Sequence, residues 1–340
     1  MPKRKGREVL TEGVREHQAT QAWLQLQAGS RSPSSLELLQ ERRDSSVYRL
    51  NDVRQDGTRV IAKRCQVAAA HKERMIYQEL LPITGMPALE CYGTVLEPDG
   101  KSCWLFLEDA KDGWYSGRFP QNRALAGRWL AETQLSTASA NLQSAIPRRG
   151  LHHYLQSLQG CRAILLHYLS MNGLPAVDAE LLRKVVAHFE ALESVWKQIE
   201  EICDVMPPSL VHGDFVYKNL RLRDTAAGPV LLVFDWEYAS WGVAAIDLAQ
   251  VGIVATPDLS IYCSILRREH SHLNLRDVQA VAACGDLLRM VDAISWAMAG
   301  YEVVLPPQLS PPLLSKVMSQ LAWLEASTAE ALRAFRMELT

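Results

Sequence analysis

The segment from residue 209 to residue 236 constrains this chain more than any other part, because polar residues interrupt its apolar runs in a way that core packing does not explain. Residues 219–235 predict a β-hairpin with its turn at 224–228. Such a hairpin returns Asp235 to the neighbourhood of Asn219. The segment therefore predicts two side chains with oxygen ligands next to each other.

Asp214 stands just before this hairpin, and four residues separate it from Asn219. The catalytic loop of protein kinases has the same interval between aspartate and asparagine. We expect the Asp214 carboxylate to meet a substrate hydroxyl, and Asn219 and Asp235 to hold Mg²⁺, which prefers oxygen ligands. Gly213 would allow a tight bend, and His212 would brace the loop. One aspartate alone is more often a cap or turn residue, but the whole set at these intervals favours catalysis.

Length and composition fit a globular protein of one large domain or two lobes, with 340 residues of which 48% are hydrophobic and 22% charged. The seven cysteines form no CxxC pair, so neither a zinc site nor a disulfide framework is indicated. No apolar run reaches the roughly 18 residues of a membrane helix. We expect a cytoplasmic protein without a membrane partner.

Charge is distributed unevenly along the chain. Residues 1–150 contain 22 Lys and Arg against 17 Asp and Glu, a net charge of +5, and residues 151–340 contain 14 against 21, a net charge of −7. A basic first part suits a polyphosphate and an acidic second part suits a cation, although inert surface charge explains the asymmetry equally well. The basic residues at 3–7 are typical of a solvated terminus, so no nucleic-acid partner is expected.

The first 109 residues alternate strand and helix patterns. Residues 8–28 predict a helix, and a break at 29–35 is followed by a short predicted helix at 36–42. Predicted strands then flank a further helix; the strands are at 46–51, 58–64, 89–96 and 102–107, and the helix is at 68–81. This order predicts an antiparallel sheet with one helix against it.

Helical patterns dominate after residue 109, at 122–140, 150–171, 178–203, 274–300 and 310–337. The predicted fold class is therefore α+β, with a small antiparallel lobe and a larger helical lobe. We expect three parts: an N-terminal extension at 1–33, a nucleotide-binding lobe at 34–109 and a helical lobe at 110–340.

The runs VHGDFVYKNL and VFDWEYASWGVAAIDLA, at residues 211–220 and 233–249, resemble the aminoglycoside phosphotransferase and choline kinase-like family. That resemblance implies the bilobal protein-kinase-like fold. It also implies that Asp214 is the catalytic base and that Asn219 and Asp235 bind the metal. Asp247 matches a distal aspartate that helps to hold the C-terminal lobe together in that family.

The N-terminal lobe resembles the family in the same order. Lys63 in VIAK resembles the lysine that contacts ATP phosphates, and Glu73 resembles its helix partner, with Glu79 as the competing candidate. Residues 107–109 (LED) resemble the hinge beside the adenine ring. Because of this hinge position we expect a nucleotide contact at Glu108. The loop before Lys63 contains no glycine, so we expect phosphate contacts there from Ser45 and Ser46.

These features predict a small-molecule kinase that uses ATP, with GTP as an open alternative, and Mg²⁺. The rival interpretation is an inactive ATP-binding module. The acceptor is a small hydroxylated molecule, and the DWEYA run favours a cation over a neutral sugar or other natural-product hydroxyl, although Glu237 would serve as well to brace the metal loop. Candidate substrate residues are Glu237, Asp292, Trp296 and Glu302, and ordinary helical spacing explains the last three equally well.

Overall fold

The computed structural model describes residues 8–42, 45–54, 56–110, 113–138, 146–170 and 174–302, together with eight scattered residues between 322 and 335. The chain forms two compact units: unit 1 is Met1–Tyr115 with Lys218–Tyr238, and unit 2 is Ser116–Tyr217 with Ala239–Thr340. We expected one continuous lobe at 110–340, yet the hairpin region belongs to unit 1. The helix expected at 310–337 lies almost wholly outside the described residues.

Unit 1 is built on a six-stranded antiparallel sheet with the strand order β1-β2-β3-β4-β6-β5. Alternate residues of β4 face opposite sides of this sheet, so Val60 and Ala62 enter the apolar core while Ile61 and Lys63 line a cavity on the other side. The strands are β1 (Val9–Leu10), β2 (Ser35–Arg42), β3 (Ser45–Asn51), β4 (Val60–Gln66), β5 (Cys91–Leu96) and β6 (Ser102–Glu108).

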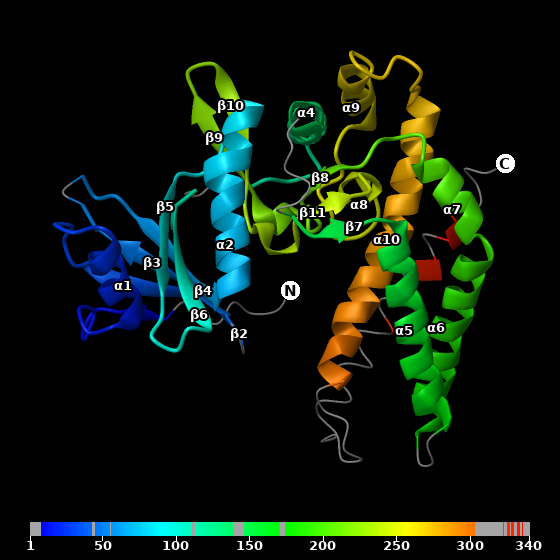
Figure 1. Cartoon of the computed structure of the whole chain (residues 1–340), viewed down its shortest axis with the longest axis horizontal. Coiled ribbons are helices and arrows are strands. Elements are labelled where there is room, and N and C mark those ends of the chain that lie inside the picture. Colours follow the sequence, from blue (N-terminus) through cyan, green and yellow to red (C-terminus); the bar gives the residue numbers. More distant parts are fainter. Residues whose placement is uncertain are drawn as a thin grey trace. The chain divides into compact units, whose positions relative to one another are not determined.

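One helix covers each face of the sheet: α1 (Gln18–Leu26) packs on one side and α2 (Val67–Met75) on the other (Figure 1). The helical path of α2 continues through a π-turn at Ile76–Leu80 and through α3 (Leu81–Thr84), and Gly85 ends it in a left-handed conformation with φ 64°. The helix predicted at 68–81 is thus present, although it is divided into three pieces.

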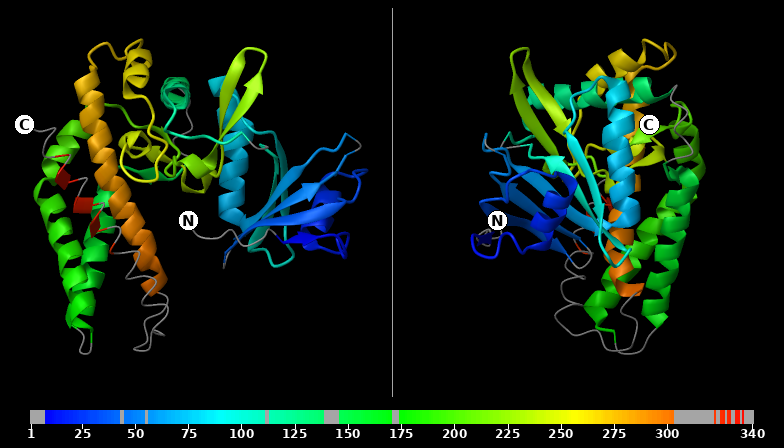
Figure 2. Two further views of the ribbon diagram at one scale, coloured as in Figure 1. Left: turned by 180° about the vertical axis from the view of Figure 1, so that it is seen from behind. Right: turned by 60° about the vertical axis from the view of Figure 1, so that its left-hand side comes forward.

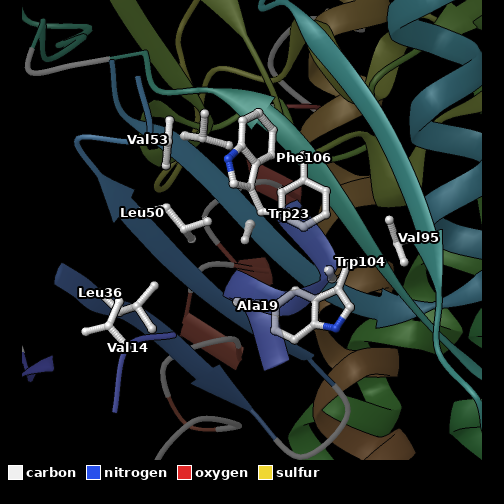
Figure 3. Close-up of a cluster of buried hydrophobic side chains, with 12 residues drawn as sticks. Val14, Ala19, Trp23, Leu36, Leu50, Val53, Val95, Trp104 and Phe106 are labelled. Atoms are coloured by element: carbon white, nitrogen blue, oxygen red, sulfur yellow. The ribbon is translucent and has the colours of Figure 1, made fainter. Parts of the chain in front are cut away.

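The N-terminal segment differs from the single helix expected at 8–28. Val9 and Leu10 form an edge strand, and the helix begins only after His17, whose Nδ1 accepts a hydrogen bond from the Ala19 amide. Trp23 of α1 is completely buried, and its ring centroid lies 5.4 Å from that of Phe106 (Figure 3). This segment is part of the core of unit 1 and not an appended extension.

The prediction of a helix at 36–42 is wrong, because this segment is the strand β2. Its leucines and glutamates favour a helix locally, but Leu36 pairs with Leu50 of β3 and both side chains are fully buried against α1. Pairing and burial at the tertiary level outweigh the local preference.

A two-stranded hairpin of β9 (Leu220–Thr225) and β10 (Gly228–Val233) completes unit 1 and confirms the hairpin predicted from the sequence. Leu220 pairs with Val233 at its base, and the Phe234 amide donates a hydrogen bond to the Asn219 carbonyl at 3.1 Å. Asn219 and Asp235 therefore stand at the same end of the hairpin, as predicted.

Unit 2 is mainly helical, and α5 packs against both α6 and α10 (Figure 2). The helix expected at 178–203 is interrupted at Val195. Among the described residues, no helix is long and apolar enough to cross a membrane. The helices are α4 (Pro120–Ala138), α5 (Leu151–Ser170), α6 (Ala176–Ser194), α7 (Trp196–Cys203), α8 (Ala245–Leu248), α9 (Leu259–Leu266) and α10 (Leu275–Glu302). Three short strands, β7 (Arg148–Arg149), β11 (Ser240–Gly242) and β8 (Ser209–Val211), form a small sheet in that order.

Candidate functional site

Unit 1 contains a cavity of about 250 Å³ on the face of the sheet opposite α1. Apolar side chains from β3, β4 and β6 form one part of its wall, and charged side chains form another. The residues predicted for nucleotide and metal binding that line it are Ser45, Lys63, Glu73, Glu108, Asn219 and Asp235, and Glu237 lines it as well.

Lys63 is the centre of the charged wall. Its Nζ lies 2.7 Å from Glu73 Oε1, forms an ion pair with Asp235 and lies 3.6 Å from Glu237 Oε2. Burial acts to lower the pKa of Lys63, but attraction to these three carboxylates outweighs it and holds the pKa well above its usual value. The lysine is therefore a fixed cation, and its helix partner is Glu73, which decides between the two predicted glutamates.

Asn219 and Asp235 supply oxygen atoms to the same cavity. Asp235 has a left-handed backbone with φ 70°, which is uncommon for a residue other than glycine. No group of three or more His, Cys, Asp and Glu side chains within the described ranges is arranged to hold a metal ion. One carboxylate and one amide nevertheless suit Mg²⁺, which usually keeps water and phosphate oxygens as its other ligands.

Glu237 contacts cations of unit 1. Besides Lys63, its carboxylate lies 3.8 Å from Arg42 Nη1, and its backbone carbonyl accepts a hydrogen bond from Lys72. These contacts favour the interpretation that Glu237 braces the metal loop, although its use as an acceptor residue stays a prediction.

The two serines predicted for nucleotide contact differ in position. Ser45 lines the cavity, whereas Ser46 is absent from its wall because neighbouring residues of a strand point to opposite sides. Contact of Ser46 with the nucleotide stays a prediction. Glu108 lines the cavity, but its carboxylate is paired with Arg223 at 2.5 Å.

Sequence reasoning missed Arg49, a buried arginine in the cavity wall. Its guanidinium donates to Asp109 Oδ2 at 2.8 Å and to Glu37 Oε2 at 2.7 Å, and so connects the β2–β3 pair with the end of β6. The strand pattern could have indicated Arg49, because residues two positions apart in a strand face the same side and Arg49 is two positions after Val47, which also lines the cavity.

Asp214, the predicted base, lies in unit 2 in the loop after β8. Asp247 of α8 accepts hydrogen bonds from the backbone amides of His212 (2.6 Å) and Gly213 (3.0 Å), and the Asp214 amide donates to His212 Nδ1 at 3.2 Å. Gly213 has φ 78°, which explains the need for glycine at this bend. Asp247 therefore has a more local role than expected, since it fixes the loop that carries Asp214.

Two buried side chains of α10 face this loop. Arg289 forms an ion pair with Asp214, and Asp292, three residues later, interacts electrostatically with both. Burial raises the pKa of Asp292 to about 6, with a smaller contribution from the negative charge of Asp214. Trp296 is partly exposed one turn further on, and Glu302 is the last residue of α10, with its side chain outside the described part.

Comparison with known proteins gives a family match over most of the chain. The family model described as "Phosphotransferase enzyme family" matches residues 35–283. The chain belongs to this family. It is thus a small-molecule phosphotransferase, and the predicted family and kinase class are confirmed. A search of curated protein sequences found no match.

Solved structures of the same fold include aminoglycoside and choline kinases. An aminoglycoside 2″-phosphotransferase in complex with GDP and kanamycin has 13% identity and a TM-score of 0.59, with coverage of 89% of this chain and 97% of that one. Spectinomycin phosphotransferase with ADP and spectinomycin has 10% identity and a TM-score of 0.58, with 90% and 97% coverage. Choline kinase from Cryptosporidium parvum has 11% identity and a TM-score of 0.55, with 89% coverage of both chains. At these identities the likeness concerns the fold, and the predicted bilobal kinase-like class is confirmed.

Proposed function

We propose that this phosphotransferase moves the γ-phosphoryl group of ATP to a hydroxyl of a small molecule with the help of Mg²⁺. The observation that carries this proposal is the cluster of Lys63, Glu73 and Asp235 in the wall of a cavity that also receives Asn219. Two of the fold relatives named above were solved with GDP or ADP, which supports a nucleotide in this cavity and keeps GTP as the alternative to ATP.

Each residue has a distinct task in this proposal. Lys63 donates hydrogen bonds to phosphate oxygens, and the buried carboxylate of Glu73 holds its ammonium group in place. Asn219 and Asp235 would hold Mg²⁺, which neutralises the charge of the phosphate groups when it is bound. Asp214 accepts the proton of the acceptor hydroxyl.

The rival function is a nucleotide-binding module without turnover. A chain that has lost catalysis is expected to lack the base, the lysine or a metal ligand. This chain retains Asp214, Lys63, Asn219 and Asp235. The Lys63 side chain pairs with Glu73 and Asp235 in unit 1, and the Asp214 side chain pairs with Arg289 in unit 2. We therefore favour the enzyme.

For the acceptor we propose a hydroxylated cation such as an aminoglycoside or an amino alcohol. The support is the net charge of −7 over residues 151–340 and the fold relatives, which include an aminoglycoside phosphotransferase and a choline kinase. Asp292 is the candidate for contact with the cation because it lies beside Asp214. A neutral sugar remains the competing acceptor.

The test is consumption of ATP and of GTP, with Mg²⁺, across aminoglycosides, amino alcohols and neutral sugars at low and high salt. We expect turnover with a cationic acceptor that weakens as salt screens the attraction. Asp214→Asn is the control for turnover, and calorimetric binding of the nucleotide is measured in parallel. Binding without turnover for any acceptor would favour the inactive module, and salt-independent turnover of a neutral sugar would remove only the cationic acceptor.

A further inference from the structure

Arg289 of α10 makes two directed contacts with the loop that carries the proposed base. Its Nη2 lies 3.2 Å from Asp214 Oδ1, and its Nη1 lies 3.5 Å from the Gly213 carbonyl oxygen. Only 9% of the Arg289 side chain and 8% of the Asp214 side chain are exposed. The contact is therefore a buried bridge, in which solvent screens the charges much less than at a surface ion pair.

A guanidinium group is suited to such a bridge because its donors form a rigid planar fork. One arm of the fork meets the Gly213 carbonyl and the other meets the Asp214 carboxylate. Since the two acceptors are on consecutive residues, the fork limits rotation of the carboxylate relative to its own backbone. Asp247 holds the same loop from α8, through the amides of His212 and Gly213.

Arg289 also balances the charges that face it. Asp214 comes from the loop, Asp247 from α8 and Asp292 from α10, and all three carboxylates interact with the Arg289 guanidinium. Burial raises the pKa of Asp247 to about 7, and attraction to Arg289 opposes that rise. Other ionisable groups around this cluster, among the described residues, include His212 of the loop, Arg149 of β7 and Tyr154 of α5.

We propose that Arg289 is a positioning residue for phosphoryl transfer, which holds the Asp214 carboxylate in one orientation and keeps it ionised among its acidic neighbours. This inference rests on the proposed function of Asp214 as the base. The competing role is purely structural, an anchor between α10 and the loop. An anchor would affect stability without changing the rate at which the folded protein hydrolyses MgATP.

The test measures the protonation of Asp214 directly. Carboxyl-carbon NMR titration of protein labelled at aspartate, with Asp214→Asn to assign the signal, gives its midpoint in the wild type, in Arg289→Met and in Arg289→Lys. We expect Arg289→Met to raise the Asp214 midpoint by about 1 pH unit or more, because an opposite charge has been removed. An unchanged midpoint in a folded Arg289→Met protein would overturn the proposal.

Arg289→Lys keeps a positive charge but loses the planar fork, so it tests the orientation of the Asp214 carboxylate separately from its charge. It also provides a second test of the proposal if Arg289→Met does not fold. We expect a nearly normal Asp214 midpoint, slow hydrolysis of MgATP with water as acceptor reduced about tenfold, and an unchanged KM for ATP. Hydrolysis equal to that of the wild type would contradict the positioning role.

Arg268→Met is the matched control. Arg268 lies elsewhere in unit 2 and pairs with Glu132 at 2.9 Å, and its side chain is 57% exposed. Its replacement should leave both the titration midpoint of Asp214 and the hydrolysis of MgATP unchanged. If Asp214→Asn retained normal hydrolysis, the base assignment would fail, whereas the NMR midpoint would still decide whether Arg289 controls the ionisation of Asp214.

Discussion

Both units place one cation among three carboxylates, but they use different cations in different surroundings. In unit 1, Lys63 faces Glu73, Asp235 and Glu237 in the wall of a cavity. In unit 2, Arg289 faces Asp214, Asp247 and Asp292, all of which are buried. The cluster in unit 1 is thus accessible from a cavity, and the cluster in unit 2 is nearly closed.

The difference indicates two ways of using charge. A compact ammonium group on a flexible stem can exchange one carboxylate for a phosphate oxygen, and Asp235, whose side chain is 27% exposed, is the partner most open to such an exchange. A rigid guanidinium fork is better suited to keep its partners fixed. We therefore expect substitutions in unit 1 to affect ligand binding, and substitutions in unit 2 to affect turnover and the response to pH.

The largest effect on the chemical step alone should come from Asp214→Asn. The amide keeps the shape of the side chain but cannot accept the hydroxyl proton as a carboxylate does, so turnover should fall by about 100-fold or more while MgATP still binds. Rates with the acceptor found in the panel and calorimetric MgATP binding are the measurements. Retention of more than about a tenth of the wild-type rate would remove Asp214 from the role of base.

In unit 1, we expect Asp235→Asn and Asp235→Ala to weaken the binding of MgATP. Both variants lack the charge of the proposed metal ligand, so binding of MgATP should weaken and turnover should be lost, whereas binding of ATP in EDTA should change little. Asparagine tolerates the left-handed backbone at φ 70° better than alanine does, so only the alanine variant should also lose about 1 kcal/mol of stability. Unchanged affinity and rate would assign Asp235 to a structural role.

The smallest effect concerns Asp292 and the pH dependence of stability. Because burial raises its pKa to about 6 from 3.8, the folded protein binds this proton more tightly than the unfolded chain. The stabilisation from that proton is complete below pH 3.8 and is lost as pH rises through about 6.

Asp292→Asn should therefore become more stable relative to the wild type as pH rises from about 4 to about 7. The gain should be roughly 2 kcal/mol, at about 1.4 kcal/mol per pKa unit. Melting temperatures across this range test the prediction, with the exposed Glu180→Gln as control. A stability difference that does not depend on pH would show that the Asp292 carboxyl titrates normally.

Much of the site was predictable because its residues are close in sequence. The interval from Asp214 to Asn219 and the hairpin that returns Asp235 are local features, and the strand pattern around Lys63 is local as well. Arg289 could not be found in this way, since 75 residues separate it from Asp214 and nothing near it in the sequence indicates a partner. The segment at 36–42 was misassigned for a related reason, because its strand pairing with β3 is not encoded in its own composition.

The α1 helix and the strand before it lie outside the family match at 35–283, yet Trp23 and Ala19 cover Leu36, Leu50 and Phe106 (Figure 3). A relative without such a segment needs polar residues at the corresponding positions of its sheet, or another element to cover them. A fragment of this chain made for protein production therefore has to include α1. Without α1 the apolar face of the sheet would be exposed, and the fragment would tend to aggregate.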